Sequence, residues 1–432
     1  MNDIPLISVT GTKGKTTTVS LIAVGLQHLG HNVMHVDTSG HYVNGERKSN
    51  AQDSLDVWGI KTVTQAPGRY LGEFLRNPQL HDNGIAVLEA SFSCYKRGLG
   101  YGSHDVGVFL NVFNDHIDPE GQIKNRHDLA MAKSFIFSSI ARDGYAVFNA
   151  DDDMVCQMLD RIQPSRNIHL IPCGSTFEYF DIAAHIHQGG AYVSLKDRKI
   201  TWHSSSGEDL LMDLSSAEWA FNGMYEPLAM NMMYAAAAIR AQHIDTPLGL
   251  VQDALKKTRL SPDTGRSSVM KAANGSLIIA DFAHEPESLK AVAKLGRQLL
   301  PENGKLWGIV RLSHERSDEV IHQTGVLAGS LFDELIIYDK IDGHFRVPGP
   351  PYITRYPQEI GRVSKIMRDG ASETNTNVER IVREDEAIQK VAQHIQPDDV
   401  VVVIINDDTD RSLGFIRGAF LVDVTIEIFD KI

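Results

Sequence analysis

The residues with the clearest chemical potential form a short glycine-rich loop. Gly11, Thr12, Lys13, Gly14, Lys15, Thr16 and Thr17 follow an apolar stretch at residues 6–10 and precede an amphipathic stretch at residues 19–29. A strand, a glycine loop and a helix in this order form a phosphate-binding unit, because loop N–H groups and the helix amino terminus attract phosphate oxygens. In such a unit Lys15 reaches the β- and γ-phosphates, and the Thr16 hydroxyl binds Mg²⁺.

The loop departs from the full phosphate-loop pattern GxxxxGK[ST]. Val9 stands at the position of the first glycine, and the nearest glycine is Gly11. A plain glycine turn ahead of a helix is the alternative interpretation. We favour the phosphate loop because residues 14–16 read Gly-Lys-Thr at the correct end of a strand–loop–helix unit.

Two further polar residues stand at or after the ends of predicted strands. Glu89 lies near the end of the apolar stretch 85–90, and His116 follows the stretch 106–111. Open parallel sheets gather their ligands at the carboxyl ends of the strands, which favours a site here. A surface carboxylate is the alternative for Glu89. A capping or core histidine is the alternative for His116, since Mg²⁺ prefers oxygen ligands.

The composition is that of an ordinary globular protein. The chain has 432 residues, 42% of them hydrophobic, and a net charge of −13. The acidic charge disfavours broad binding to nucleic acid or to an anionic membrane. Three cysteines without a CxxC pair predict free thiols in a reducing compartment. With no signal peptide pattern and no apolar run of about 18 residues, we predict a cytoplasmic protein.

Short apolar runs alternate with helical patterns along the chain, which predicts an α/β fold with parallel sheets. Residues 261–265 are the best linker candidate. We therefore predict a phosphate-loop, parallel-sheet domain over residues 1–264 and a smaller α/β domain over residues 265–432. The main strand candidates are residues 6–10, 33–37, 85–90, 106–111, 145–149, 277–281, 306–311, 335–338 and 400–405.

Several motifs occur in the order found in the Mur ligase superfamily, and the chain resembles this family over nearly its whole length. The loop resembles the family's ATP loop, residues 88–91 its metal-binding glutamate segment, and residues 111–118 its Asn-x-x-x-Asp-His-x-Asp motif. Residues 149–152 resemble the end of its central-domain strand, and residues 281–289 the motif that opens its carboxyl-terminal domain. The resemblance implies a central ATPase domain, a Rossmann-like second domain, and ATP-dependent joining of a carboxylate to an amine through an acyl phosphate.

The resemblance also implies a catalytic and metal-binding set. Lys15, Glu89, His116 and Lys133 would be catalytic, and two Mg²⁺ ions would be held by Thr16, Glu89, His116 and Lys133. Lys133 would act as a carbamate formed with CO₂, which turns the cation into an oxygen ligand. An exposed helix lysine with its stem packed on the surface is the alternative.

Nucleotide contacts are implied in both domains. Asn231 resembles the asparagine that reads adenine, although the residues before it depart from the family's Gly-x-His-Asn spacing. Arg266 resembles an arginine that meets the nucleotide when the domains close, and Asp281 and His284 would face the same cleft. The predicted nucleotide-binding residues are Gly11, Thr12, Lys13, Gly14, Lys15, Thr16, Thr17, Asn231, Arg266, Asp281 and His284.

The choice among ligases rests on what surrounds these motifs. The loop begins at residue 11, which leaves no room for the uridine-nucleotide-binding domain of peptidoglycan ligases. Residues 37–45, 97–101 and 404–409 resemble the Mur-like half of cyanophycin synthetase, which adds arginine to an aspartate β-carboxylate; the ATP-grasp half of that enzyme is not in the sequence. We expect a ligase that adds an amino acid to a peptide or small-acid carboxylate, as a homo-oligomer or with a separate partner enzyme, and without nucleic acid or membrane.

Three alternatives stay open. Folylpolyglutamate synthetase has a similar length but usually has Gly-Ser where this chain has Thr16 and Thr17. Poly-γ-glutamate synthase usually carries a membrane-anchoring segment that is not found here. A non-catalytic nucleotide-binding subunit has no chemical need for Lys15, Glu89 and Lys133 together, which argues against that alternative.

Overall fold

The computed structural model describes residues 4–50, 67–77, 81–91, 94, 98–114, 123–260, 265–313, 316–339, 359–406 and 408–422. The chain divides into two compact units, Met1–Leu260 (unit 1) and Ser261–Ile432 (unit 2). Each unit is described by itself. The expected domain boundary between residues 264 and 265 lies next to this division, and residues 261–264 lie outside the described residues, so that boundary stays a prediction.

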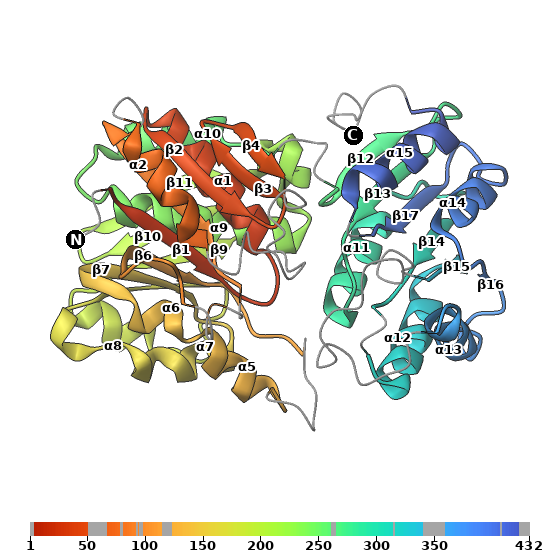
Figure 1. Ribbon diagram of the computed structural model, residues 1–432, viewed down its shortest axis with the longest axis horizontal. Coiled ribbons are helices and arrows are strands. Elements are labelled where there is room, and N and C mark those ends of the chain that lie inside the picture. The colour runs from red at the N-terminus through yellow and green to blue at the C-terminus, as the bar shows by residue number, and fades with distance from the viewer. Residues whose placement is uncertain are drawn as a thin grey trace. The chain divides into compact units, whose positions relative to one another are not determined.

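One large sheet runs through unit 1 (Figure 1). Its strand order is β11-β10-β9-β8-β7-β6-β1-β5-β2-β3-β4; neighbours from β9 to β2 are parallel, and both ends are antiparallel. The elements are β1 (Leu6–Thr10), α1 (Lys15–His28), β2 (Asn32–Asp37), β3 (Gly40–Val43), β4 (Glu46–Asn50), α2 (Leu71–Arg76), β5 (Gly84–Glu89), β6 (His104–Phe109), α5 (Arg126–Lys133), α6 (Phe135–Ser138), β7 (Ile140–Asn149), α7 (Asp153–Gln157), β8 (His169–Gly174), α8 (Ile182–His187), β9 (Tyr192–Lys196), β10 (Lys199–Ser204), β11 (Gly207–Asp213), α9 (Glu226–Gln242) and α10 (Leu248–Lys257).

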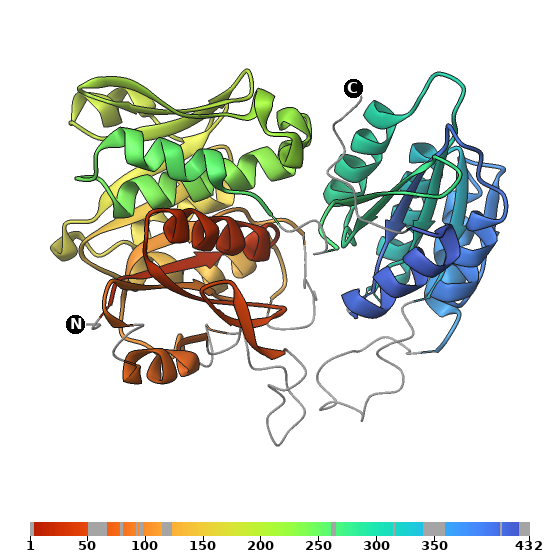
Figure 2. The same ribbon diagram turned by 90° about the horizontal axis from the view of Figure 1, so that it is seen from above.

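Helices cover both faces of this sheet, which explains why its central strands are buried and mostly apolar. All residues of β1 and β5 are buried, as expected for parallel strands between two helical layers. On one face α1 packs beside α9 (Figure 2), and a Cβ added at Gly25 of α1 would lie 2.5 Å from Cδ1 of Ile239. On the other face Phe109, Phe137 and Phe148 join α6 to β6 and β7 in one core cluster.

Unit 2 contains a smaller sheet of order β12-β13-β17-β14-β15-β16, in which only the β12–β13 pair is antiparallel among the described strands. Helices α12 and α13 lie side by side (Figure 1). The elements are β12 (Ser268–Lys271), β13 (Leu277–Asp281), α11 (Pro286–Leu299), β14 (Leu306–Val310), α12 (Asp318–Leu331), β15 (Glu334–Ile337), α13 (Arg362–Ala371), β16 (Val378–Arg380), α14 (Glu384–Ala392), β17 (Val400–Ile404) and α15 (Thr409–Phe420). The predicted fold class, two α/β sheets in sequence, is confirmed.

The structure shifts two predicted boundaries and places the start of helix α9. Helix α1 begins at Lys15, so the threonines after it belong to the helix rather than to the loop. Strand β6 ends at Phe109, two residues earlier than predicted, because the following residues turn toward the glycine loop. Helix α9 begins at Glu226 with Pro227 in its first turn, where a proline costs no hydrogen bond. Asn231 therefore lies in the second turn and not at the start of the helix.

The cysteines agree with the prediction of free thiols. Cys94 and Cys173 are buried, and burial raises the pKa of the Cys94 and Cys156 thiols to about 12. Across the described residues, no helix has both the length and the apolar character needed to cross a membrane.

Two buried histidines predict acid sensitivity of the fold. Burial lowers the pKa of His35 and of His104 from 6.5 to about 4, because it disfavours the charged ring. Between pH 6.5 and pH 4 the two histidines bind protons in the unfolded chain but not in the folded protein. The free energy of unfolding is therefore highest above pH 6.5 and decreases as the pH falls toward 4. From pH 7.5 to 5 we expect a loss of roughly 2 kcal/mol per histidine. Urea unfolding at pH 7.5 and at pH 5 measures this loss of stability.

The matched variants for this measurement are His104→Phe and His187→Gln. The first removes a buried ring that titrates on unfolding and should flatten the pH dependence. The second alters an exposed ring and should leave the pH dependence of stability as in the wild type. If His104→Phe keeps the full wild-type pH dependence, burial of His104 is not its source.

Candidate functional site

The glycine loop lies at the carboxyl end of β1, the strand between β5 and β6 in the middle of the unit 1 sheet. Gly14 precedes the first turn of α1 with φ +82°, a conformation that glycine adopts without steric cost. A Cβ at Gly14 would overlap Oδ1 of Asn231. No acidic side chain stands in the first turn of α1, so the helix itself carries no negative charge at the positive end of its dipole.

Asn111, which follows β6, holds the loop in place. Its Oδ1 accepts the N–H groups of Thr12 and Lys13 at 3.0 and 2.9 Å, and its Nδ2 donates to the Lys13 carbonyl at 3.2 Å. The N–H of Phe113 donates to Thr12 Oγ1 at 3.0 Å. The loop is therefore shaped from outside by the segment after β6. Asn111 opens the Asn-x-x-x-Asp-His motif, yet we did not assign it this role.

A threonine and a glutamate meet beside the loop. Thr16 Oγ1 donates to Glu89 Oε2 at 2.8 Å. The N–H of Thr38 donates to the same oxygen at 3.3 Å, and its hydroxyl lies 3.0 Å from Thr16 Oγ1. Glu89 is 1% exposed, so the surface-carboxylate alternative is wrong. We did not predict Thr38; its position directly after a parallel strand was the available signal.

Lys133 ends α5 and reaches the loop from the side. It is 3% exposed, and its Nζ donates to the Gly11 carbonyl at 2.8 Å. The alternative of an exposed helix lysine is therefore wrong. Lys133 and Glu89 both act electrostatically on the buried Cys94 thiol, so the three side chains lie close together.

The charge around the loop suits a polyphosphate. Lys15 folds back over the loop, where its Nζ donates to the Thr12 carbonyl at 3.0 Å. Lys13, Lys15 and Lys133 thus place three positive charges near the loop, against the one negative charge of Glu89. A net positive region next to a helix amino terminus attracts anions.

The predicted metal ligands are only partly described. Thr16 and Glu89 supply oxygen atoms, which are the donors that Mg²⁺ prefers. Lys133 fits this set as a carbamate and not as an ammonium group. His116 lies outside the described residues. Among the residues that the structure describes, no group of three or more His, Cys, Asp and Glu side chains could hold a metal ion.

The three predicted nucleotide contacts of unit 2 gather at the carboxyl end of β13. The Oδ2 of Asp281 accepts the N–H and the hydroxyl of Ser267, both at 2.8 Å, and burial raises the pKa of this carboxyl group. The guanidinium carbon of Arg266 lies 4.8 Å from the centre of the Phe282 ring. His284 packs edge-on against the same ring, and its Nδ1 lies 2.7 Å from the Phe282 carbonyl.

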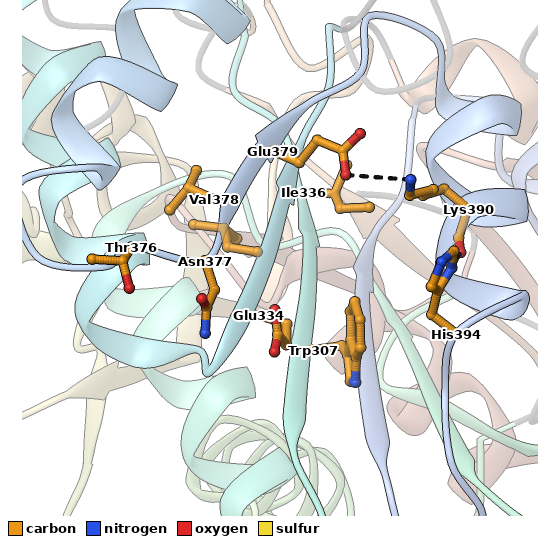
Figure 3. A pocket seen from close by; sticks show the side chains of 10 residues that line it. Trp307, Glu334, Ile336, Thr376, Asn377, Val378, Glu379, Lys390 and His394 are labelled. Carbon is orange, nitrogen blue, oxygen red and sulfur yellow. Dashed lines mark hydrogen bonds and ion pairs between the residues drawn. The ribbon is translucent and has the colours of Figure 1, made fainter.

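A pocket of about 470 Å³ lies at the opposite edge of the unit 2 sheet (Figure 3). Glu379 and Lys390 form an ion pair of 3.8 Å on its wall. None of the predicted site residues lines this pocket. Ligands of parallel α/β sheets bind at the carboxyl ends of the strands, and this pocket lies near the amino ends. Its lining residues are Trp307, Glu334, Leu335, Ile336, Thr376, Asn377, Val378, Glu379, Lys390 and His394.

Two family models match the chain in sequence order. The model of the Mur ligase middle domain matches residues 9–239, and the model of the Mur ligase glutamate ligase domain matches residues 265–404. The first match alone covers more than half of the chain and contains the glycine loop, Glu89 and Lys133.

Full-length relatives agree with these models. A cyanophycin synthetase of Nostoc sp. is 28% identical over 429 residues, which are 98% of this chain and 43% of that protein. The chain thus spans less than half of this relative. A UDP-N-acetylmuramoyl-L-alanyl-D-glutamate–2,6-diaminopimelate ligase of Vibrio cholerae is 27% identical over 77% of this chain and 61% of its own length.

Solved structures confirm the fold. A bifunctional folylpolyglutamate synthase/dihydrofolate synthase of Yersinia pestis, complexed with AMPPNP and a Mn ion, superimposes with a TM-score of 0.61 and 17% identity. The match covers 97% of this chain and 89% of the other. At 17% sequence identity, this similarity is evidence for the fold alone.

Gly14→Ala and Gly30→Ala form a matched pair of variants. Both glycines have positive φ, so each alanine carries a similar backbone cost of about 1 kcal/mol. A Cβ at Gly30 meets nothing within 4 Å, whereas a Cβ at Gly14 displaces the Asn231 side chain. We expect Gly14→Ala to weaken ATP binding at least about tenfold relative to Gly30→Ala. Calorimetric titration measures the ATP affinity of both variants. Equal affinities would contradict phosphate binding by the loop.

Proposed function

The chain belongs to the Mur ligase family, and from this premise we propose that it is an ATP-dependent, ADP-forming ligase that joins a carboxylate to an amine through an acyl phosphate. The observation that carries the proposal is the Thr16–Glu89 pair directly beside the glycine loop. A scaffold has no need for a buried carboxylate at this point, whereas phosphoryl transfer needs a metal-binding oxygen next to the phosphates. The match to the Mur ligase middle domain supports it.

The proposed reaction has two steps. The loop N–H groups hold the phosphates, and Lys15 turns from the Thr12 carbonyl toward the γ-phosphate, where negative charge accumulates. A carboxylate oxygen of the acid attacks the γ-phosphorus, and ADP leaves. The amine nitrogen then attacks the acyl carbon, phosphate leaves with the bonding electrons, and the amine loses a proton. The loop positions the reactants for the first step.

Mg²⁺ would supply positive charge that offsets the charge on the phosphate oxygens. We propose Thr16 and Glu89 as its ligands, with His116 and a carbamylated Lys133 completing a set for two ions. Thr16 orients the Glu89 carboxylate through their hydrogen bond, and Lys133 lies within reach of the loop, which supports this assignment.

The remaining nucleotide contacts are proposals of the same kind. We propose that Asn231 recognises adenine, supported by its position against Gly14 and its 3.4 Å contact with Thr18 Oγ1. We propose Arg266, Asp281 and His284 as further contacts, supported by their grouping at the carboxyl end of β13.

For the substrates, we propose that an amino acid is added to a peptide or small-acid carboxylate, as in cyanophycin synthesis. The support is the similarity to cyanophycin synthetases over 98% of this chain. We propose a homo-oligomer or a separate partner enzyme as the working form. We also propose a cytoplasmic location, supported by three free thiols.

The test is release of ADP and phosphate by purified protein with ATP and Mg²⁺. Single amino acids are combined with a panel of acids that includes aspartyl-arginine oligomers and folates. We expect release that requires both an acid and one particular amine. Stimulation by folate and glutamate would favour a folylpolyglutamate-type ligase, and AMP in place of ADP would contradict the acyl phosphate.

Lys15→Ala and Lys199→Ala serve as matched variants in this assay. Lys15 lies in the loop, and its loss should lower turnover at least about a hundredfold, since a loop lysine offsets charge that develops during transfer. Lys199 is exposed on β10 and far along the sheet from β1, so its loss should leave turnover unchanged. Normal turnover by Lys15→Ala would remove the glycine loop from the mechanism.

The carbamate on Lys133 has its own test. Protein equilibrated with ¹³C-bicarbonate should give one carbamate carbon signal that disappears in Lys133→Arg. The arginine keeps a cation that can donate to the Gly11 carbonyl but cannot form the carbamate. We therefore expect Lys133→Arg to be inactive yet folded. Full activity of this variant would show that Lys133 acts as a cation.

A further inference from the structure

We propose that Asp152 and Arg126 are positioning residues for the glycine loop, acting through the backbone of Val112. Within the described part of the chain, neither residue forms a hydrogen bond or ion pair with the loop. For nucleotide binding this inference rests on the proposed function, and its effect on the loop conformation does not depend on that function.

Both polar groups of the Val112 backbone form hydrogen bonds with side chains. Its N–H donates to Asp152 Oδ2 at 2.8 Å, and its carbonyl accepts from Arg126 Nε at 3.0 Å. Arg126 Nη2 also donates to Asp153 Oδ1 at 3.0 Å, which ties α5 to α7. Val112 itself is fully buried, so no water replaces these bonds if they are lost.

Val112 is the middle residue of the segment that holds the loop. Asn111 before it binds Thr12 and Lys13, and Phe113 after it donates to Thr12 Oγ1. One side of this segment therefore faces the loop and the other side is fixed to α5 and α7. If the second attachment is released, the Asn111 amide loses its fixed backbone, and the loop loses the partner that shapes it.

Asp152 performs two tasks with two different oxygens, and this allows them to be separated. Oδ1 accepts the N–H groups of Met154 and Val155, caps α7 and lies 3.7 Å from Arg126 Nη2, whereas Oδ2 accepts from Val112. Serine is a good helix cap but has one short, uncharged oxygen. Asp152→Ser therefore keeps the cap and removes both the acceptor for Val112 and the charge that pairs with Arg126.

Asp181→Ser is the matched control. Asp181 caps α8 in the same unit by accepting the N–H of Ala184 at 2.9 Å, and among the described residues no hydrogen bond joins it to the loop segment. Both substitutions replace a capping carboxylate with a capping hydroxyl. Arg126→Met is a second variant of the same network, because it removes the donor to the Val112 carbonyl and keeps most of the side-chain stem.

The first measurement is hydrogen–deuterium exchange of the full chain without nucleotide. We expect Asp152→Ser and Arg126→Met to speed exchange in the peptide that contains residues 11–16 by about fivefold or more. Exchange over residues 153–157 in Asp152→Ser should match the wild type. Unchanged exchange at residues 11–16 in both variants would overturn the proposal, and faster exchange confined to α7 would reduce Asp152 to a helix cap.

The second measurement is ATP affinity of the same proteins. We expect a loss of about fivefold or more for Asp152→Ser and Arg126→Met, with Asp181→Ser at the wild-type value, when all proteins are measured at a temperature at which they are fully folded. Equal ATP affinity in all four proteins would overturn the positioning role. A wild-type protein that binds no ATP would contradict the proposed function, and the exchange measurement would still decide the inference.

Discussion

The arrangement of the site depends on the bonds between Asn111 and the glycine loop. A glycine loop has little conformational preference of its own, so its shape must be imposed by neighbours. Asn111 satisfies two loop N–H groups and one loop carbonyl with a single side chain. This fixes the end of β1 to the end of β6, directly before the amino terminus of α1. The same constraint brings Gly11 within reach of Lys133.

Burial gives the site residues their chemical character. Glu89 and Lys133 are both almost fully buried, and an isolated buried charge is costly unless other groups bind it. Thr16 and Thr38 bind Glu89, and the Gly11 carbonyl binds Lys133. A metal ion and a nucleotide would add further charged groups beside these two buried charges.

Local sequence patterns predicted the fold well for a physical reason. Strands buried on both faces are mostly apolar, so β1, β13 and β17 stand out in the sequence, and a glycine loop between strand and helix marks the site. The sequence did not predict that Lys133 is buried or that Asn111 and Asp152 share the support of the loop. Those facts depend on contacts between residues 40 to 122 positions apart, which no local pattern encodes.

The most direct test of the acyl phosphate follows an oxygen atom. The acid substrate identified by the release assay is labelled with ¹⁸O in its carboxylate, and the released phosphate is analysed by mass spectrometry after one turnover. Our account predicts one ¹⁸O atom in each phosphate, because the carboxylate oxygen that attacks the γ-phosphorus leaves with it. Phosphate without ¹⁸O, or label in AMP, would contradict it.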